Sequence, residues 1–449
     1  MGLAFRFGAC CWVAALSCNA GGGQNVSAPA YIYTEAPRYD SGAVPAGGER
    51  FPAGAVLQLV SNGRKRELAP GFAASADAAV SFDGRRVLFS GKRKPSDSWQ
   101  IWEIVLNKGA AYPITRGGED SIAPFYLPMD RLVYARRTPA GRQLVSIARN
   151  GGDALQLTYG PGDHVPSDVL PDGRILFEAL HPGGSTGSRD LFTVYPDGSG
   201  VETYRCDHGP DRHAAREVSS GDIVFETAGR LARFTSARAV QMDLPQPRGE
   251  FAGPVAEISP GEWLVSYRAD AHAPYGLYRW SRSQAPPVKL VEIAGAQALQ
   301  PVLVRPRSVP NRFPSALRER PGANLLCLNV YASRLPIAAG SVNAVRVWAL
   351  DDRGSPVMLG QAPVERDGSF YVQAPGERPI RFQLLDRSGK IVASEKGWFW
   401  ARKGEQRVCV GCHAGPERAP ENASPETLVR SLEPVELTLP VHSARGGSK

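Results

Sequence analysis

The fold is decided by a short stretch, Asp83-Gly84-Arg85-Arg86-Val87-Leu88-Phe89, in which a polar turn leads directly into a run of apolar residues. Such a turn and run are typical of an antiparallel strand and its connection. The pattern returns four times, as Asp130-Arg131-Leu132-Val133-Tyr134, Asp172-Gly173-Arg174-Ile175-Leu176-Phe177, Gly221-Asp222-Ile223-Val224-Phe225 and Gly261-Glu262-Trp263-Leu264-Val265. The matching residues Val87, Leu132, Ile175, Ile223 and Trp263 are separated by 45, 43, 48 and 40 residues, the period of a β-propeller blade.

Each repeat also contains further strands. Apolar runs at residues 99–104 and 190–195 lie between the turns, so that a repeat supplies the four strands of a blade. Five repeats are visible, and a sixth blade is predicted to join residues 55–60 to residues 301–304, because this removes the last open sheet edge. The Asp-Gly-Arg and Pro-Asp-Gly turns resemble those of TolB-type propellers. We therefore predict an all-β chain with a six-bladed, TolB-like β-propeller at residues 51–305.

A second, smaller domain is predicted after a linker at residues 306–322, which contains Pro306, Pro310, Pro314 and Pro321 and favours neither strand nor helix. Short apolar runs separated by glycine-containing turns follow, and they indicate a small β-sandwich at residues 323–418. Residues 419–449 are predicted to form a tail.

The strongest functional motif lies at the end of this sandwich, at Cys409-Val410-Gly411-Cys412-His413. The C-x-x-C-H spacing is typical of a c-type haem attachment site, in which two thiols bind the porphyrin and the adjacent imidazole binds the iron. A structural zinc pair and a redox-active thiol pair are the alternatives. Zinc usually takes a second pair of ligands, and a thioredoxin-like pair needs a βαβ context; neither is evident. One covalent haem c is the favoured prediction.

The N-terminus predicts export. Residues 1–17 hold one basic residue and a short apolar run, followed by small residues just ahead of Cys18, as in a bacterial lipoprotein signal peptide. Cys18 is then lipidated, and residues 18–50 form a flexible tether. An ordinary secretory signal is the alternative. Either reading places the chain in the bacterial cell envelope, facing the periplasm, with the inner or outer membrane unresolved.

The sandwich and its haem motif resemble the middle domain of the hydrazine synthase alpha subunit family. The resemblance is carried by the following motifs, together with the C-x-x-C-H motif itself: Asn329-Val330-Tyr331, Gly340-Ser341-Val342, Asp367-Gly368-Ser369-Phe370, Phe382-Gln383-Leu384-Leu385-Asp386, Trp398-Phe399-Trp400 and Gly404-Glu405-Gln406-Arg407. It implies a c-type haem held where the sandwich meets the propeller.

In that family a tyrosine four residues after the motif histidine binds the iron, while the histidine turns to zinc. This chain has Glu417 at that offset, so His413 is assigned as the ordinary iron ligand. The family's second haem domain has no counterpart after the tail, and hydrazine formation itself is not expected.

Aromatic and basic residues near the motif are candidates for the haem pocket. Trp398 and Trp400 are expected on one face of a strand and Phe399 on the other, either against the porphyrin or in the sandwich core. Arg402, Lys403 and Arg407 are candidates for pairing with the haem propionates, or else solvated charges.

A second cluster combines Cys206, His208 and His213, which could hold a metal such as zinc or offer a sixth iron ligand. Its spacing fits no standard zinc signature, and a polar loop is the alternative. Cys327 lies in an apolar run and is expected to be buried, although a disulfide with Cys206 stays open. The weaker candidates are His164, His181, His272 and Met358.

Composition sets outer limits on function. The 449 residues carry a formal net charge of +8, but the basic residues are scattered, and no nucleic-acid motif is present. Three classes of function remain. The favoured one is a haem protein that exchanges single electrons with an unknown redox partner. The others are a haem enzyme acting on a small nitrogen or oxygen species, and a propeller lipoprotein that serves as a binding or scaffold protein.

Overall fold

A computed structural model describes residues 29–44, 47–180, 188–205, 209–236, 239–281, 284–334, 336–412, 419 and 422–439. The predicted signal peptide, Cys18, Cys206, His208, His181, His413 and Glu417 lie outside these residues. Within them, no helix is both long and apolar enough to cross a membrane.

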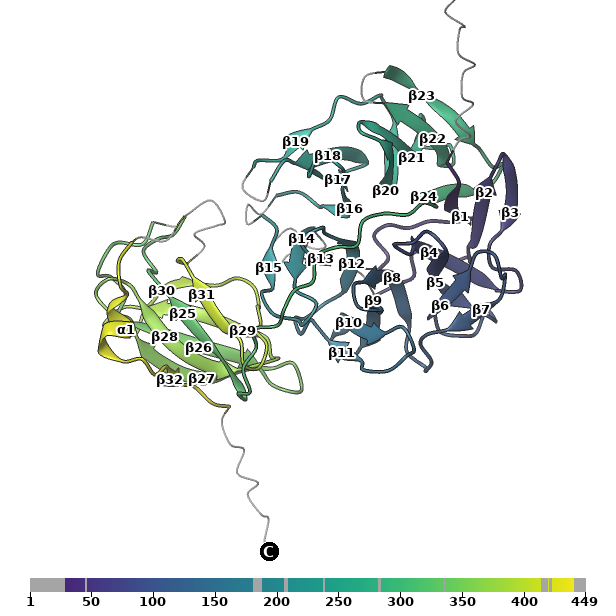
Figure 1. The fold of residues 1–449 in the computed structure, drawn as a ribbon. Helices are drawn as coiled ribbons and strands as arrows, with labels where there is room; N and C mark the ends of the chain where they lie inside the picture. The colour runs from purple at the N-terminus through teal and green to yellow at the C-terminus, as the bar shows by residue number, and fades with distance from the viewer. Residues whose placement is uncertain are drawn as a thin grey trace, which may run out of the picture.

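The larger lobe is a β-propeller built from four-stranded antiparallel sheets that follow one another along the chain (Figure 1). Four of them are β4–β7 (Ala74–Val80, Arg86–Lys92, Gln100–Val105, Ala111–Pro113), β8–β11 (Ser121–Leu127, Arg131–Thr138, Gly141–Ala148, Leu155–Gln156), β12–β15 (His164–Val169, Ile175–Leu180, Arg189–Val194, Glu202–Thr203) and β16–β19 (His213–Glu217, Ile223–Thr227, Arg230–Phe234, Met242–Asp243). The fifth is β20–β23 (Glu250–Ser259, Glu262–Arg268, Gly276–Ser281, Gln284–Val291). The five repeats of the sequence are the second strands of these sheets, β5, β9, β13, β17 and β21.

These second strands are buried on both faces, because each sheet packs between two neighbouring sheets. In β5, for example, Val87, Leu88 and Phe89 are all fully buried. Burial on both sides explains why the repeats are continuous apolar runs rather than alternating patterns.

The sixth sheet joins the two ends of the propeller, in the order β24 (Gln297–Leu303), β1 (Tyr31–Ala36), β2 (Val56–Ser61) and β3 (Arg64–Glu67). The predicted partners β2 and β24 do share one sheet, but β1 lies between them and pairs with both. This corrects the predicted tether at residues 18–50, since residues 31–36 form a strand of the propeller. The Tyr31-Ile32-Tyr33 run supplies the buried side chains that hold it there.

The innermost strand of each sheet is interrupted by a shift in register. At four of these shifts a non-glycine residue has a positive φ: Asp77, Ala123, Ala214 and Gln300, with φ between 51° and 56°. β-bulges of this kind bend a strand and re-aim its side chains. All four residues line a cavity in the middle of the propeller, to which Asp77 and Gln300 bring polar side chains.

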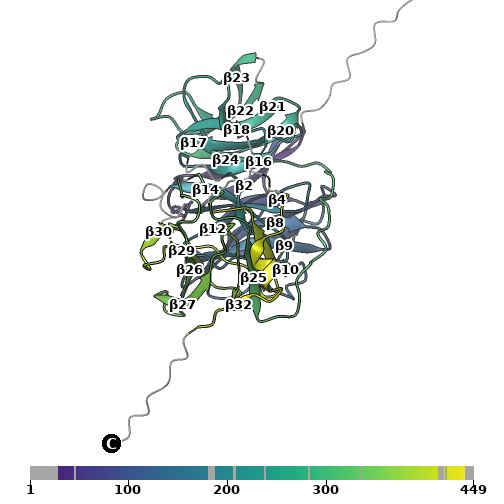
Figure 2. The same cartoon turned by 90° about the vertical axis from the view of Figure 1, so that its left-hand side faces the viewer.

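The smaller lobe is a β-sandwich of two four-stranded sheets (Figure 2). One contains β31 (Gln406–Cys409), β25 (Gly322–Cys327), β28 (Phe370–Pro375) and β32 (Val435–Glu436); the other contains β27 (Pro356–Pro363), β26 (Ala344–Leu350), β29 (Ile380–Leu385) and β30 (Ile391–Ser394). In β26 the apolar residues Val345, Val347 and Ala349 alternate inward, as the pleat of a strand requires.

Part of the predicted tail belongs to this sandwich, which corrects the boundary at residue 418. The helix α1 (Glu426–Arg430) leads to β32, which pairs in parallel with β28, and Leu437 enters the core. The linker after β24 runs across the propeller to the sandwich (Figure 1).

Candidate functional site

The first motif cysteine ends a strand that is short but firmly placed. β31 pairs in parallel with β25, with Cys409 opposite Cys327, and Leu328 donates a backbone hydrogen bond to the Cys409 carbonyl at 2.9 Å. Cys409 is therefore anchored to the central part of the sandwich, where the loop that carries Cys412 begins.

The loop between the two motif cysteines packs tightly against residues 329–332. A Cβ on Gly411 would lie 2.1 Å from the Ala332 carbonyl oxygen and 2.7 Å from that of Asn329. No side chain fits there, so the second x of the C-x-x-C motif must be glycine in this structure. Asn329 is itself fixed by a hydrogen bond from the Tyr331 amide to its side chain, at 2.9 Å.

Cys409, Cys412 and Cys327 are all free thiols. Burial raises the pKa of Cys409, and it raises the pKa of Cys412 to about 12, with Glu395 and Cys409 acting in the same direction. Cys409 and Cys412 are partly exposed, whereas Cys327 is buried beneath them. Two partly exposed cysteines three residues apart, one ending β31 and one on the loop after it, fit the covalent attachment of haem c, and His413 follows directly in the sequence.

The aromatic triplet beside the motif divides between the two lobes. Phe399 packs edge-on against Phe382 in the sandwich core, at a centroid distance of 5.1 Å. Trp400 points the other way and stacks on the propeller residue His164 at 5.2 Å, while Trp398 lies under Arg381. Phe399 and Trp400 thus point to different lobes, but residues 398–400 form only a bridge at Phe399 and not the predicted strand. Trp400 serves the contact between the lobes.

The predicted propionate partners are engaged at this same contact. Arg402 pairs with Glu377 at 2.7 Å and donates to the Tyr159 hydroxyl at 2.5 Å, while Lys403 pairs with Glu377 at 3.1 Å. Arg407 donates to the carbonyl oxygens of Trp400 and Val201. All three cations therefore have protein partners, and two of them join the sandwich to the propeller.

His164 is a packing residue of the propeller side. Its Nδ1 lies 3.0 Å from the Gln143 side-chain oxygen, and its ring contacts Phe177 and Trp400. Burial lowers the pKa of His164 to about 3, so the ring is neutral. Of the other weak candidates, His272 is exposed in a turn and Met358 is exposed on β27.

His213 lies in the propeller channel, beside Glu226 and near Arg50. Its Nε2 is 2.6 Å from Glu226, and Glu178 and Arg189 line the same cavity. Burial lowers the pKa of His213 to about 4 and raises that of Glu226 to about 7. Within the described ranges no group of three His, Cys, Asp or Glu side chains is placed to hold a metal. The predicted partners Cys206 and His208 lie outside those ranges.

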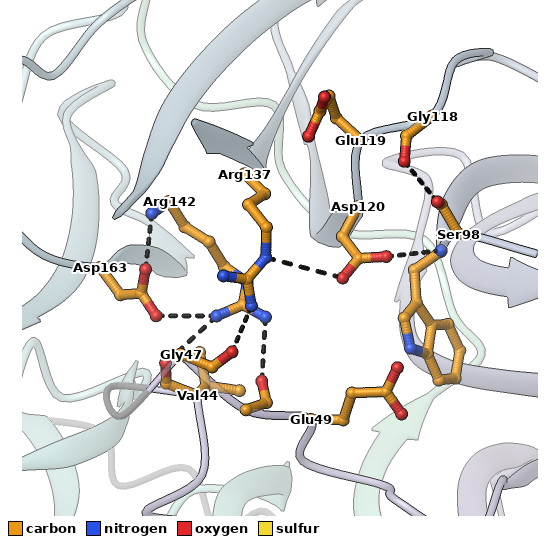
Figure 3. Close-up of polar contacts among 12 residues, drawn as sticks. Val44, Gly47, Glu49, Ser98, Gly118, Glu119, Asp120, Arg137, Arg142 and Asp163 are labelled. Atoms are coloured by element: carbon orange, nitrogen blue, oxygen red, sulfur yellow. Dashed lines mark hydrogen bonds and ion pairs between the residues drawn. The ribbon is translucent and has the colours of Figure 1, made fainter. Parts of the chain in front are cut away.

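One feature was missed by the sequence analysis: residues 37–44 and 47–50, the N-terminal plug, close one end of the channel. Arg142, which is 1% exposed, pairs with Asp163 at 2.7 Å and donates to the plug carbonyls of Val44 and Gly48 (Figure 3). Arg50 of the plug pairs with Asp77 at 3.0 Å. In the sequence, the plug is announced only by the apolar residues of β1 that precede it, which predict a strand there but not the plug itself.

These features define a class of protein in which a β-propeller is docked on a β-sandwich that carries a C-x-x-C motif. Residues 339–414 match the family model of the hydrazine synthase alpha subunit middle domain. The chain is also similar in structure to hydrazine synthase from Kuenenia stuttgartiensis, with a TM-score of 0.78 and 17% identity over 90% of this chain and 71% of that one. Residues 339–414 are thus similar to the middle domain of the hydrazine synthase alpha subunit, which confirms the predicted resemblance, and the chain as a whole shares the fold of the Kuenenia protein.

TolB from Acinetobacter baumannii matches with a TM-score of 0.48 and 14% identity, over 62% of this chain and 67% of that one. No curated protein sequence matches this chain significantly.

Proposed function

We propose that the chain is an exported, lipid-anchored c-type haem protein that exchanges single electrons with a redox partner. One observation carries the proposal: Cys409 and Cys412 are free, partly exposed cysteines at the end of β31 and on the loop after it, inside the stretch that matches the alpha subunit middle domain. When bound there, haem supplies a one-electron couple.

The roles of the protein's own residues follow from this placement. Cys409 and Cys412 bind the porphyrin, and His413 binds the iron. The pairing of β31 with β25 holds the loop, and the Gly411 contact sets its path. An electron carrier needs no open position on the iron, so two protein ligands suffice. A sixth ligand from Cys206, His208 or His213 remains part of the proposal, as does a zinc ion at that cluster.

The proposed propeller has six blades in a closed ring. Its support is that the innermost strands contact one another in the cyclic order β4, β8, β12, β16, β20, β24 and back to β4. The proposed anchor is the lipid on Cys18, which places the chain on a bacterial membrane facing the periplasm, without a nucleic-acid partner.

The test is a haem stain of the exported protein on a denaturing gel, made in a host that assembles c-type cytochromes. Cys409→Ala and Cys412→Ala are each expected to weaken the stain strongly, and His413→Ala to change the iron spin state in the absorption spectrum. Cys327→Ala is the matched control, since this third thiol of the sandwich lies outside the motif. A colourless parent protein, or equal staining in all variants, contradicts the proposal.

Carbon monoxide separates carrier from enzyme. The reduced carrier keeps its spectrum when carbon monoxide is added, because both axial positions are filled. A shifted spectrum favours instead an enzyme acting on a small nitrogen or oxygen species at an open iron. The anchor is tested separately, since Cys18→Ser moves the protein from the membrane to the soluble fraction if Cys18 carries lipid.

A further inference from the structure

The end of the propeller channel opposite the plug opens into a cavity of about 340 Å³, within the size range of sites for small ligands. It is surrounded by the C-terminal ends of the innermost strands, and residues 305–308 of the linker cross its rim. Much of its wall is apolar and is formed by Val80, Val169, Val218, Val255, Val302 and Leu303.

This cavity continues inward as a narrower space of about 60 Å³, and the two share Phe125, Arg216 and Val302 in their walls. The plug residues Tyr39 and Arg50 line the inner end. His213 lines it as well; the side chain is 5% exposed, and its Nδ1 has no hydrogen-bond partner among the described residues. The two adjacent spaces, with the plug at the inner end and the linker at the outer end, are here named together the channel chamber.

Three carboxyl groups line the mouth of the channel chamber, and two of them have hydrogen-bond donors from the backbone. Burial raises the pKa of the third, Glu217, to about 7, and the charges of Asp168 and Asp172 act in the same direction. Asp168 accepts from the amides of Val169 and Glu217 at 2.8 and 3.0 Å. Glu257 accepts from the amide and hydroxyl of Ser219 at 2.7 and 3.1 Å.

Three arginines line the same walls: Arg216, Arg305 and Arg307. Arg305 donates to the backbone carbonyl oxygens of Ile258 and Glu257 at 2.8 and 2.7 Å. The Arg216 guanidinium lies over the Phe125 ring at 4.9 Å and donates one bond, to the carbonyl of Ala215 at 3.1 Å. Arg307, on the exposed linker, lies over the Phe82 ring at 4.4 Å. In the part of the chain that the structure describes, neither of these last two guanidinium groups has a carboxylate oxygen within 4.0 Å, the limit for an ion pair.

Charged residues at both ends of the channel chamber affect the pKa of Arg216. Burial lowers its pKa, and the charges of Arg307 and Arg50 act in the same direction, while Asp168 and Glu178 oppose them. Burial lowers the pKa of Arg307 too, and there as well the charge of Asp168 opposes the shift without cancelling it, so Asp168 only partly compensates the two arginines. Such a pair, held on aromatic rings beside an apolar wall, favours an anion between them.

We propose that the channel chamber binds a small organic carboxylate, whose carboxylate group is held by Arg216 and Arg307 and whose apolar part lies against the valine walls. Guanidinium groups match a carboxylate with two parallel hydrogen bonds each. An inorganic oxyanion would satisfy the arginines but leave the apolar walls unused. The site involves propeller and linker residues only, so it stands independently of the haem proposal.

The experiment is titration calorimetry on the full exported protein with two pairs of probes, each a carboxylate and its uncharged amide: benzoate with benzamide, and hexanoate with hexanamide. At least one carboxylate is expected to bind, and its amide to bind at least tenfold more weakly. Arg216→Gln and Arg307→Gln are each expected to lower the affinity for the carboxylate at least tenfold. Arg66→Gln is the control, since Arg66 is exposed on the outer strand β3.

Three results overturn the proposal. The first is that neither carboxylate binds, or that each amide binds as well as its carboxylate. The second is that both chamber variants bind like the parent, or that Arg66→Gln loses as much affinity as they do. The third is that sulfate binds more tightly than either carboxylate, which assigns the arginines to an inorganic anion. Should Arg216→Gln fail to fold, Arg307→Gln on the exposed linker decides alone.

Discussion

Gly411 is the residue on which the geometry of the C-x-x-C loop depends, because a side chain there would overlap two carbonyl oxygens. We expect Gly411→Ala to lower the free energy of unfolding by about 1–3 kcal/mol, the usual effect of adding a methyl group to a filled space. Haem loading, measured by the gel stain, is expected to fall with it. Gly118→Ala is the control, since no atom lies within 4 Å of a Cβ there. Equal unfolding temperatures for the two variants would show that the loop can move to accept a methyl group at residue 411, which contradicts the prediction.

The raised pKa of Glu226 makes the stability of the propeller depend on pH and fixes the direction of that dependence. A carboxyl with a pKa of about 7 in the folded state and about 4.5 when unfolded stabilises the fold at low pH, and this contribution is lost as the pH rises through 7. Glu226→Gln cannot ionise, so its stability relative to the parent should rise by about 1–3 kcal/mol between pH 5 and pH 8. His213 acts in the opposite sense, since its pKa of about 4 removes stability only as the pH falls from about 6.5 toward 4.

Urea unfolding at both pH values measures this difference. Glu119→Gln, an exposed carboxylate, is the control and should change little at either pH. A Glu226→Gln protein whose relative stability is the same at pH 5 and pH 8 would refute the raised pKa.

At the scale of elements, the plug depends on the buried pair of Arg142 and Asp163. Removing one partner of such a pair leaves an uncompensated charge and typically costs 3–5 kcal/mol, whereas replacing both by apolar residues is often neutral. Arg142→Leu should therefore destabilise the propeller by about 3 kcal/mol or more and expose the plug to trypsin at Arg50. The double variant Arg142→Leu/Asp163→Leu should regain stability without closing the plug. Resistance of Arg142→Leu to trypsin would exclude this role.

The elements also show what the sequence could and could not predict. The second strands of the propeller sheets were predictable, because a polar turn and a strand buried on both faces leave a local signal. β1, the plug and β32 were missed, since each is short and is held by partners far away in the sequence, such as Arg142 and Val372. The motif predicted Cys409 and Cys412, but the position of Cys327 beneath them follows from a parallel pairing that no local pattern reveals.

At the scale of the whole molecule, a few residues of the sandwich hold it against the propeller through ring contacts and hydrogen bonds. Trp400, 4% exposed, stacks on His164 and lies in the same apolar cluster as Leu157 and Phe177 of the propeller. Arg402 and Arg407 add hydrogen bonds around it. The aromatic ring supplies the buried area, so the docking of the sandwich should depend on it more than on the arginines.

Trp400→Ala is therefore expected to cost about 3–5 kcal/mol of interface stability and to uncouple the two lobes. Because each lobe has its own core, calorimetry should then show two unfolding transitions where the parent shows one. Trp398→Ala is the matched control, since Trp398 is partly exposed beneath Arg381 and lies outside the contact; it should keep a single transition. Haem bound at Cys409 and Cys412 should remain attached in both variants, because the thioether bonds need only the sandwich. A single transition at the parent temperature in Trp400→Ala would show that the linker and the arginines alone hold the lobes together.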